Sequence, residues 1–199
     1  MHSRTSIIFL VVLILTPMGQ LAVDLYIPSL PLIAKDLHTS MSLTQQTVSI
    51  YLLALGIGQF IYGPLSDSWG RKNAIFAGTF LFLIGSLLAS FAHSIEMLLI
   101  ARAVQGLGGA AATVLSKVVA VDIYKNQQLT RASAYIGLVW GVSPVIAPAI
   151  GGMLEVFSGW RLGFAVLTCY AFIFIILAYF LLEETLPHKK MFHLKSLKK

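Results

Sequence analysis

Two ionisable side chains, Asp24 and Arg102, lie inside long apolar stretches of the chain. A carboxylate within a membrane-spanning helix costs about 2.5–3.5 kcal/mol on insertion scales, so it usually faces a cavity or a partner. An arginine stays protonated in practice and is costly facing lipid, so Arg102 should point inward. Both residues are expected in the outer half of the membrane, where contact between them is geometrically plausible. Asp24 could therefore bind and release a proton, because burial raises and a nearby cation lowers the pKa of a carboxyl group.

Each of these two residues also has a simpler interpretation. Asp24 lies shortly before Pro28 and is compatible with an interfacial charge at a helix end. Arg102 is compatible with a side chain that snorkels to the outer interface or only holds helices together. Gln105 follows one turn after Arg102, and the Gly and Ala residues at 106–112 permit close helix packing.

A short polar stretch, Gly63–Asn73, joins two apolar segments and should form a tight turn between helices. Such a turn needs glycine where backbones approach closely, and its charges must lie at the water interface or pair with one another. The residues that meet these needs are Gly63, Asp67, Gly70, Arg71 and Lys72.

A third pattern combines glycine and proline within one apolar segment. Its members are Gly141, Pro144, Pro148, Gly151 and Gly152. Glycines on one helix face allow tight approach, and each proline removes a backbone donor and bends the axis. A helix of this kind suits a moving interface, but ordinary tight packing explains it equally well because Gly and Pro are common in spanning helices.

The composition indicates that all these residues are carried by membrane helices. Hydrophobic residues make up 57% of the 199 positions and charged residues only 11%, which excludes an ordinary soluble globule. About 20 apolar residues cross the hydrocarbon core, and six such runs are present. They lie near Ser6–Ile27, Thr44–Pro64, Asn73–Ala92, Ile95–Ala120, Arg131–Glu155 and Leu162–Leu182. We therefore expect an all-α polytopic membrane protein.

The distribution of the cations predicts the orientation of these spans. With the amino terminus in the cytoplasm, two cations, Lys35 and Arg161, lie on the outer side, and Arg102 lies within the membrane. The cytoplasmic side then holds Arg4, Arg71, Lys72, Lys117, Lys125, Arg131, Lys189, Lys190, Lys195, Lys198 and Lys199. This bias satisfies the positive-inside rule. It places both termini in the cytoplasm and explains the net charge of +6 without nucleic-acid binding.

The remaining reactive residues give no sign of an enzyme or a metal protein. Cys169 is the lone cysteine and lies in an apolar segment, so it excludes an internal disulfide and is read as a small core residue. The five histidines lack metal-ligand spacing. We find no catalytic constellation and expect neither a metal nor a cofactor.

The polar stretch at 63–73 resembles the G-x-L-x-D-x-x-G-R-K signature of major facilitator superfamily transporters. A narrower resemblance, from about Gln20 to Pro187, is to the bicyclomycin-resistance (Bcr/CflA) type of drug:proton antiporter. It is carried by the signature and by four further features: Asp24-Leu-Tyr26-Ile-Pro-Ser-Leu-Pro31, Arg102 with Gln105-Gly106, Asp122-Ile-Tyr124, and the Pro144 and Pro148 helix.

This resemblance implies multidrug efflux by proton antiport across a bacterial-type inner membrane. It assigns proton coupling to Asp24 and Arg102, and a cavity or helix-interface role to Tyr26, Gln105 and the Gly–Pro residues of 141–152. Asp67, Arg71 and Asp122 would form a cytoplasmic gate cluster that steadies the outward-open state. Some related antiporters carry a second acidic residue where this chain has Thr16, so neutral drugs are expected to be handled better than cationic ones.

The length of the chain departs from the family pattern. Transporters of this superfamily contain two six-helix halves around a central cavity, and residues 1–187 account for one. Residues 188–199 resemble the start of the basic cytoplasmic linker between halves. The possible partners, besides lipid, protons and a drug-like molecule, are a second six-helix half or another copy of this chain. The alternative function is a membrane interaction module that transports nothing alone.

Overall fold

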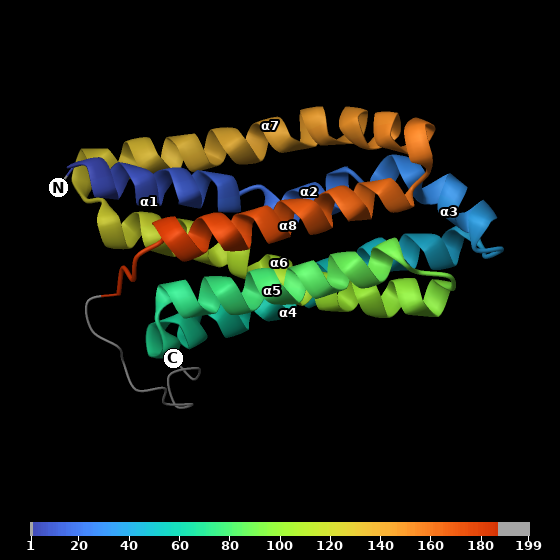
Figure 1. Cartoon of the computed structure of the whole chain (residues 1–199), viewed down its shortest axis with the longest axis horizontal. Helices are drawn as coiled ribbons and strands as arrows, with labels where there is room; N and C mark the ends of the chain where they lie inside the picture. The colour runs from blue at the N-terminus through green and yellow to red at the C-terminus, as the bar shows by residue number, and fades with distance from the viewer. Residues whose placement is uncertain (1, 187–199) are drawn as a thin grey trace.

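The computed structural model describes residues 2–186, with the side chains of residues 2 and 3 left out. The predicted basic tail at 188–199 lies outside this range. The helices run along the long axis of an elongated bundle (Figure 1). Their bounds are α1 His2–Leu15, α2 Met18–Asp24, η1 Ile27–Ser29, α3 Leu30–Asp36, α4 Met41–Trp69, α5 Arg71–Ser90, α6 Ile95–Ile123, α7 Asn126–Ser158 and α8 Arg161–Leu181.

Six membrane-length helical spans are present among the described residues, as the sequence predicts. The pieces α1, α2, η1 and α3 together form the first span, from Arg4 to Asp36, and α4 to α8 supply one span each. Because six is an even number, α1 begins and α8 ends at the same end of the bundle (Figure 1). We call this the α1/α8 end, and the opposite one the α3 end.

The first span is interrupted near its middle. The Thr16 hydroxyl donates to the Val12 carbonyl at 2.7 Å, and α1 stops one residue earlier. Pro17 has no N–H to continue the helical ladder, and α2 begins directly after it. The first span is thus interrupted at Thr16 and Pro17. The span is longer than the sequence indicated, because η1 and α3 continue it to Asp36.

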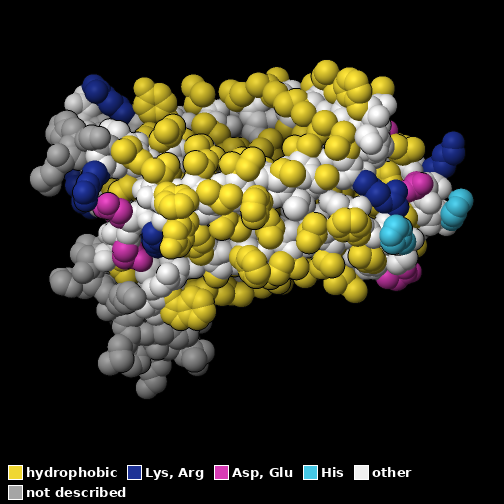
Figure 2. Space-filling model, viewed as in Figure 1, with side chains coloured by type: hydrophobic (Ala, Val, Ile, Leu, Met, Phe, Trp, Pro, Cys, Tyr) yellow, Lys and Arg dark blue, Asp and Glu magenta, His cyan; other side chains and the backbone are white. Residues whose placement is uncertain are grey.

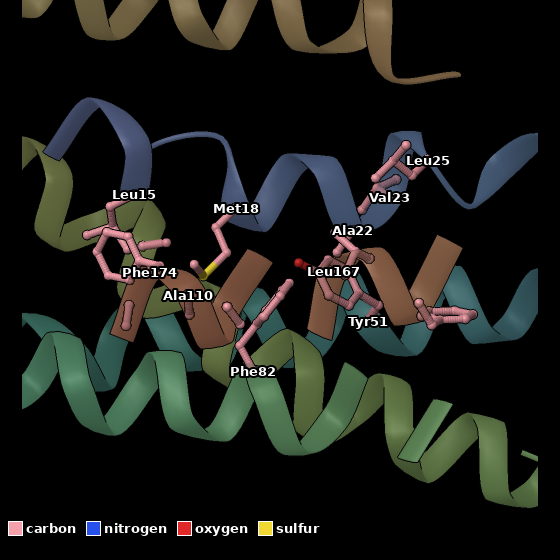
Figure 3. Packing of buried hydrophobic residues seen from close by; sticks show 14 of the residues in the cluster. Leu15, Met18, Ala22, Val23, Leu25, Tyr51, Phe82, Ala110, Leu167 and Phe174 are labelled. Carbon is pink, nitrogen blue, oxygen red and sulfur yellow. The ribbon is translucent and has the colours of Figure 1, made fainter. Parts of the chain in front are cut away.

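Helix α6 packs closely against α4 and α5 because its contact surface is built from small residues. A Cβ added at Gly106 would collide with the Tyr51 carbonyl, and one at Gly108 with the Phe82 backbone nitrogen. On the other side, Gly85 of α5 offers the same close approach to Gln105. Figure 3 shows Met18 of the first span pointing toward Ala110 and Phe82 in this core. The predicted role of the small residues at 106–112 in close helix packing is confirmed.

The sequence predicts a tight turn over residues 63–73, but most of this stretch is helical. Helix α4 continues through Gly63 and Pro64 to Trp69, and α5 starts at Arg71. The reversal takes place at Gly70, whose φ of 100° and ψ of 154° favour glycine. No atom lies within 4 Å of a Cβ added at Gly63. Only Gly70 is therefore required by the backbone.

Helix α7 contains both prolines without a break and is arched (Figure 1). A Cβ at Gly151 would collide with the Leu25 carbonyl, so the helix approaches the first span closely there. At Gly141 and Gly152 an added Cβ would meet nothing within 4 Å. The expected tight face of several glycines is therefore reduced to one close contact, because the other glycines project elsewhere around the helix.

On the face shown in Figure 2, the long side of the bundle is mostly apolar and the charged side chains gather at its two ends. Large side chains such as Phe60 of α4 and Val156 of α7 are 79% and 86% exposed. Of an apolar stretch of 18 residues in each helix, only 22% is buried in α4 and in α7, against 67% in α6. Cys169 is also exposed, so its interpretation as a core residue is wrong; it points away from the helix contacts. Surfaces of this kind suit lipid or another membrane helix.

Candidate functional site

The first candidate site is a charge cluster at the α1/α8 end, where α4, α5 and α6 meet. The Arg71 guanidinium donates through NH1 to Asp67 Oδ1 at 2.6 Å and through Nε to Asp122 Oδ2 at 3.0 Å. NH1 also donates to Ser66 Oγ at 2.6 Å. The Arg71 side chain is only 9% exposed, so these charge-assisted bonds are partly shielded from solvent. The structure thus brings together the three residues predicted for the gate cluster.

Glu184 completes this cluster, and sequence reasoning missed it. Its carboxylate accepts the Arg71 backbone N–H at 2.9 Å and that of Lys72 at 3.3 Å. These are free donors of the first turn of α5, where a negative charge is also favoured by the helix dipole. Lys72 in turn donates through Nζ to the Tyr179 carbonyl at 3.3 Å. Because Glu184 is 113 residues from Arg71, no local pattern could have revealed the contact.

The second candidate site surrounds Arg102, which is completely buried in the middle of the bundle. Its NH1 donates to the Ala22 carbonyl at 2.9 Å and to Gln105 Oε1 at 2.6 Å. Gln105 Nε2 donates to Ser86 Oγ at 2.8 Å. These bonds tie the first span, α6 and α5 together through polar groups. Arg102 does not snorkel to the interface, so that interpretation is wrong.

Aromatic rings surround the Arg102 guanidinium. Its central carbon lies 4.1 Å from the ring centroid of Tyr51, 4.6 Å from that of Tyr26 and 5.7 Å from that of Phe164. The two tyrosines are fixed by their hydroxyls: Tyr51 donates to the Gly19 carbonyl at 2.6 Å, and Tyr26 shares a hydrogen bond of 2.6 Å with Thr47. Cation–π attraction is strongest where the cation is desolvated, as it is here.

Asp24 is 5% exposed and lies at the end of α2. Its Oδ1 accepts from Gln20 Nε2 at 3.0 Å, one turn back. Its Oδ2 has no hydrogen-bond partner among the described residues, and the same holds for Nε and NH2 of Arg102. Buried polar atoms without partners are costly and infrequent, so they mark groups with another role.

The expected contact between Asp24 and Arg102 is not formed. No nitrogen of a described Lys, Arg or His lies within 4 Å of the Asp24 carboxylate. Arg102 instead binds the carbonyl of Ala22, two residues earlier. Successive helix residues are about 100° apart around the axis, so the Asp24 side chain leaves α2 in a different direction. It turns back along its own helix to Gln20.

A third polar cluster joins three elements at the α3 end. Asp36 Oδ2 accepts from Arg161 NH1 at 2.6 Å and from Trp160 Nε1 at 3.0 Å. Arg161 NH2 also donates to the Ala92 carbonyl at 2.8 Å. These bonds connect the end of the first span with the start of α8 and the end of α5. No group of three or more metal-ligating side chains occurs within residues 4–186.

The chain is similar to known transporters over most of its length. The family model described as Major Facilitator Superfamily matches residues 10–196. Multidrug resistance protein D of Escherichia coli is 33% identical over 177 residues, covering 89% of this chain and 43% of that protein. A bicyclomycin resistance protein homolog of Haemophilus influenzae is 34% identical over 190 residues, covering 95% of this chain and 47% of that protein.

A solved structure shows the same fold at low sequence similarity. The proton:xylose symporter of the major facilitator superfamily superposes with a TM-score of 0.80 and 17% identity, covering 92% of this chain and 46% of that one. The chain thus spans slightly less than half the length of the relatives it matches. Six spans among the described residues, the family match and the shared fold agree: the chain is a multi-pass membrane protein that belongs to the major facilitator superfamily, a family of transporters and not of enzymes.

Proposed function

We propose that this six-helix unit serves drug efflux by proton antiport. The observation that carries the proposal is the buried Asp24 carboxylate, whose Oδ2 has no partner, in a chain related to proteins named for multidrug and bicyclomycin resistance. A carboxylate inside a membrane bundle marks an ion or substrate path more often than a structural contact. Asp24 is accordingly the proton carrier.

Arg102 acts as the fixed charge of this path. Its bonds to Ala22 and Gln105 leave Nε and NH2 without partners. A change of protonation at Asp24 alters the electrostatic energy of the first span near this cation. Coupling requires that the two facing states of the transporter differ in their affinity for the proton and for the drug. Tyr26 and Gln105, which contact Arg102, are the residues placed to sense that difference.

The charge cluster at the α1/α8 end steadies one facing state. Arg71 bridges Asp67 of α4 and Asp122 of α6, so these helix ends move as one body while the bonds hold. If the protein lies in an inner membrane with both termini on the cytoplasmic side, this cluster faces the cytoplasm. Lys72 and the other cations at this end then lie at the cytoplasmic face of the membrane, in agreement with the positive-inside rule.

The apolar faces of α4 and α7 support a second candidate function. Both helices are largely exposed in this chain, and the relatives are about twice its length. Gly141, Pro144, Pro148 and Gly152 of α7 then contribute to a cavity or interface with a second six-helix half or another copy. Without that partner, the chain is an interaction module that transports nothing by itself.

Drug accumulation in cells that express the 199-residue chain distinguishes these functions. We expect export that an uncoupler abolishes, and loss of this export in Asp24→Asn at matched membrane levels. Glu96→Gln, which removes an exposed carboxylate at the α3 end, is the matched control and should export normally. Uncoupler-sensitive export that persists in Asp24→Asn removes Asp24 from the mechanism. No export by the correctly inserted parent chain favours the interaction module.

A further inference from the structure

A cavity of about 570 Å³ opens at the α1/α8 end between the first turns of α1, the last turn of α6 and the beginning of α7. It shares no residue with the Arg71 cluster or with the surroundings of Arg102 and Asp24. Its lining consists of Thr5, Ser6, Phe9, Ile123, Tyr124, Gln128, Arg131, Ala132 and Tyr135. Pockets of about 300–1,000 Å³ are typical for small organic ligands, so the volume suits one.

Three aromatic rings give the cavity its shape. The Phe9 ring meets Tyr124 edge-to-face, with centroids 5.2 Å apart and planes at 82°. It meets Tyr135 in the same manner at 6.5 Å and 65°. Rings in this edge-to-face arrangement offer both their flat faces and their positively polarised edges to a bound ligand. A planar aromatic molecule therefore matches the walls better than a branched aliphatic one.

Among the described residues that line the cavity, Arg131 is the one charged side chain and none is acidic. Within residues 4–186, its guanidinium makes no hydrogen bond and no ion pair. The nearby cations differ: Arg4 pairs with Glu183 at 3.3 Å, and Lys125 donates to the Val121 carbonyl at 3.1 Å. Arg131 is thus free to bind a ligand, and its planar group suits carboxylate or sulfonate in a bidentate manner.

We propose that this cavity binds planar aromatic anions, with Arg131 on the acidic group and Phe9, Tyr124 and Tyr135 around the ring. Gln128 offers an amide for a further hydrogen bond at the edge. The binding site does not depend on transport. With the orientation of the proposed function, however, it lies on the cytoplasmic side, where it would collect such molecules before they reach Arg102 and Asp24.

Three probes that share the naphthalene ring and carry a small substituent of different charge test this proposal: 2-naphthoate, neutral 2-naphthamide and the cation 2-naphthylmethylammonium. Their binding to the full chain in nanodiscs of zwitterionic lipid is measured by equilibrium dialysis, with empty nanodiscs subtracted. We expect 2-naphthoate to bind about tenfold more tightly than the amide, which corresponds to one charge-assisted contact of about 1.4 kcal/mol. The ammonium probe should bind least.

Two variants separate the contribution of the charge from that of the rings. Arg131→Gln should remove the preference for naphthoate over the amide, while Tyr135→Leu should weaken both probes. Lys125→Gln, a cation six residues earlier that does not line the cavity, should change neither. Equal affinity for anion and cation, or an unchanged preference in Arg131→Gln, overturns the proposal. Loss of antiport in Asp24→Asn leaves these binding results unaffected, so the two proposals fail separately.

Discussion

At the scale of single residues, the most unusual feature is an arginine buried without a carboxylate. Arg102 is stabilised by a carbonyl, an amide and three aromatic rings. Such a combination exploits the flat, weakly hydrated guanidinium, which a lysine ammonium cannot reproduce. It also keeps the positive charge in place whatever the protonation state of Asp24, because neither group depends on the other for a bond.

Arg102→Lys tests whether the ring contacts stabilise the fold. We expect the substitution to lower the free energy of unfolding by about 1–3 kcal/mol, since it loses the contacts of the flat guanidinium with the rings while keeping the charge. Unfolding in mixed detergent, followed by circular dichroism, measures the effect. Lys117→Arg, at an exposed cation that lies over the Trp140 ring, should change stability far less. Equal stability of Arg102→Lys and the parent would show that the rings contribute little.

The sequence was sufficient to identify Asp24 and Arg102 but not to describe their relation. Position along a helix gives the depth of a residue in the membrane, and on that basis the two share the outer half. The direction of each side chain around its helix depends on packing that no single segment determines. The pair was therefore expected to touch, whereas Arg102 binds Ala22 and Asp24 binds Gln20.

At the scale of helices, the signature stretch shows which of its glycines the backbone needs. Gly70 has a positive φ, and a side chain there would collide with the Glu184 carboxylate. Gly63 lies inside α4 with free space beside it. A side chain is therefore expected to destabilise the fold at Gly70 but not at Gly63, seven positions earlier. Sequence reasoning grouped the two because both belong to one motif.

A matched pair of alanine substitutions separates these two glycines. Gly70→Ala should destabilise the chain by about 1–3 kcal/mol, because it places a Cβ in a conformation that L residues rarely adopt. Gly63→Ala should be neutral or should stabilise α4 by up to about 1 kcal/mol. Thermal unfolding of both variants in the same detergent gives the comparison. A larger loss for Gly63→Ala than for Gly70→Ala would contradict this account of the turn.

Much of the helical architecture followed from composition alone. Runs of apolar residues with polar connections indicated six spans, and all six are present. Their ends were underestimated where polar residues remain helical, as in Ser66–Trp69 of α4 and in α3. The Asp67, Arg71 and Asp122 cluster was expected from resemblance, whereas Glu184 lies in the segment after α8, distant in sequence, and could be placed only by the fold.

At the scale of the whole molecule, the arrangement of charge predicts how the bundle lies in the membrane. Arg71, Lys72, Lys125 and Arg131 belong to the α1/α8 end, and Lys35 and Arg161 to the α3 end. The cationic end should face the cytoplasm. The two ends also differ in how they are connected, because Arg71 ties α4 to α6 while Arg161 ties the first span to α8 and α5.

Cysteine labelling in intact cells tests this orientation. In a Cys169→Ser background, His93→Cys at the α3 end should react with a membrane-impermeant maleimide. Lys125→Cys at the opposite end should react only after the membrane is permeabilised. Labelling of Lys125→Cys in intact cells would show that the orientation is the opposite one, with the cavity at Arg131 facing outward.

The interruption at Thr16 and Pro17 divides the first span into two helical segments that can change their relative angle at this point. Asp24 and Ala22 both lie in α2, and Arg102 of α6 donates a hydrogen bond to the Ala22 carbonyl. A displacement of α2 relative to α6 must therefore lengthen or break the hydrogen bond between Arg102 and the Ala22 carbonyl. Asp24 and Arg102 can in this way influence one another mechanically, through the position of a backbone oxygen, without the two charges ever meeting.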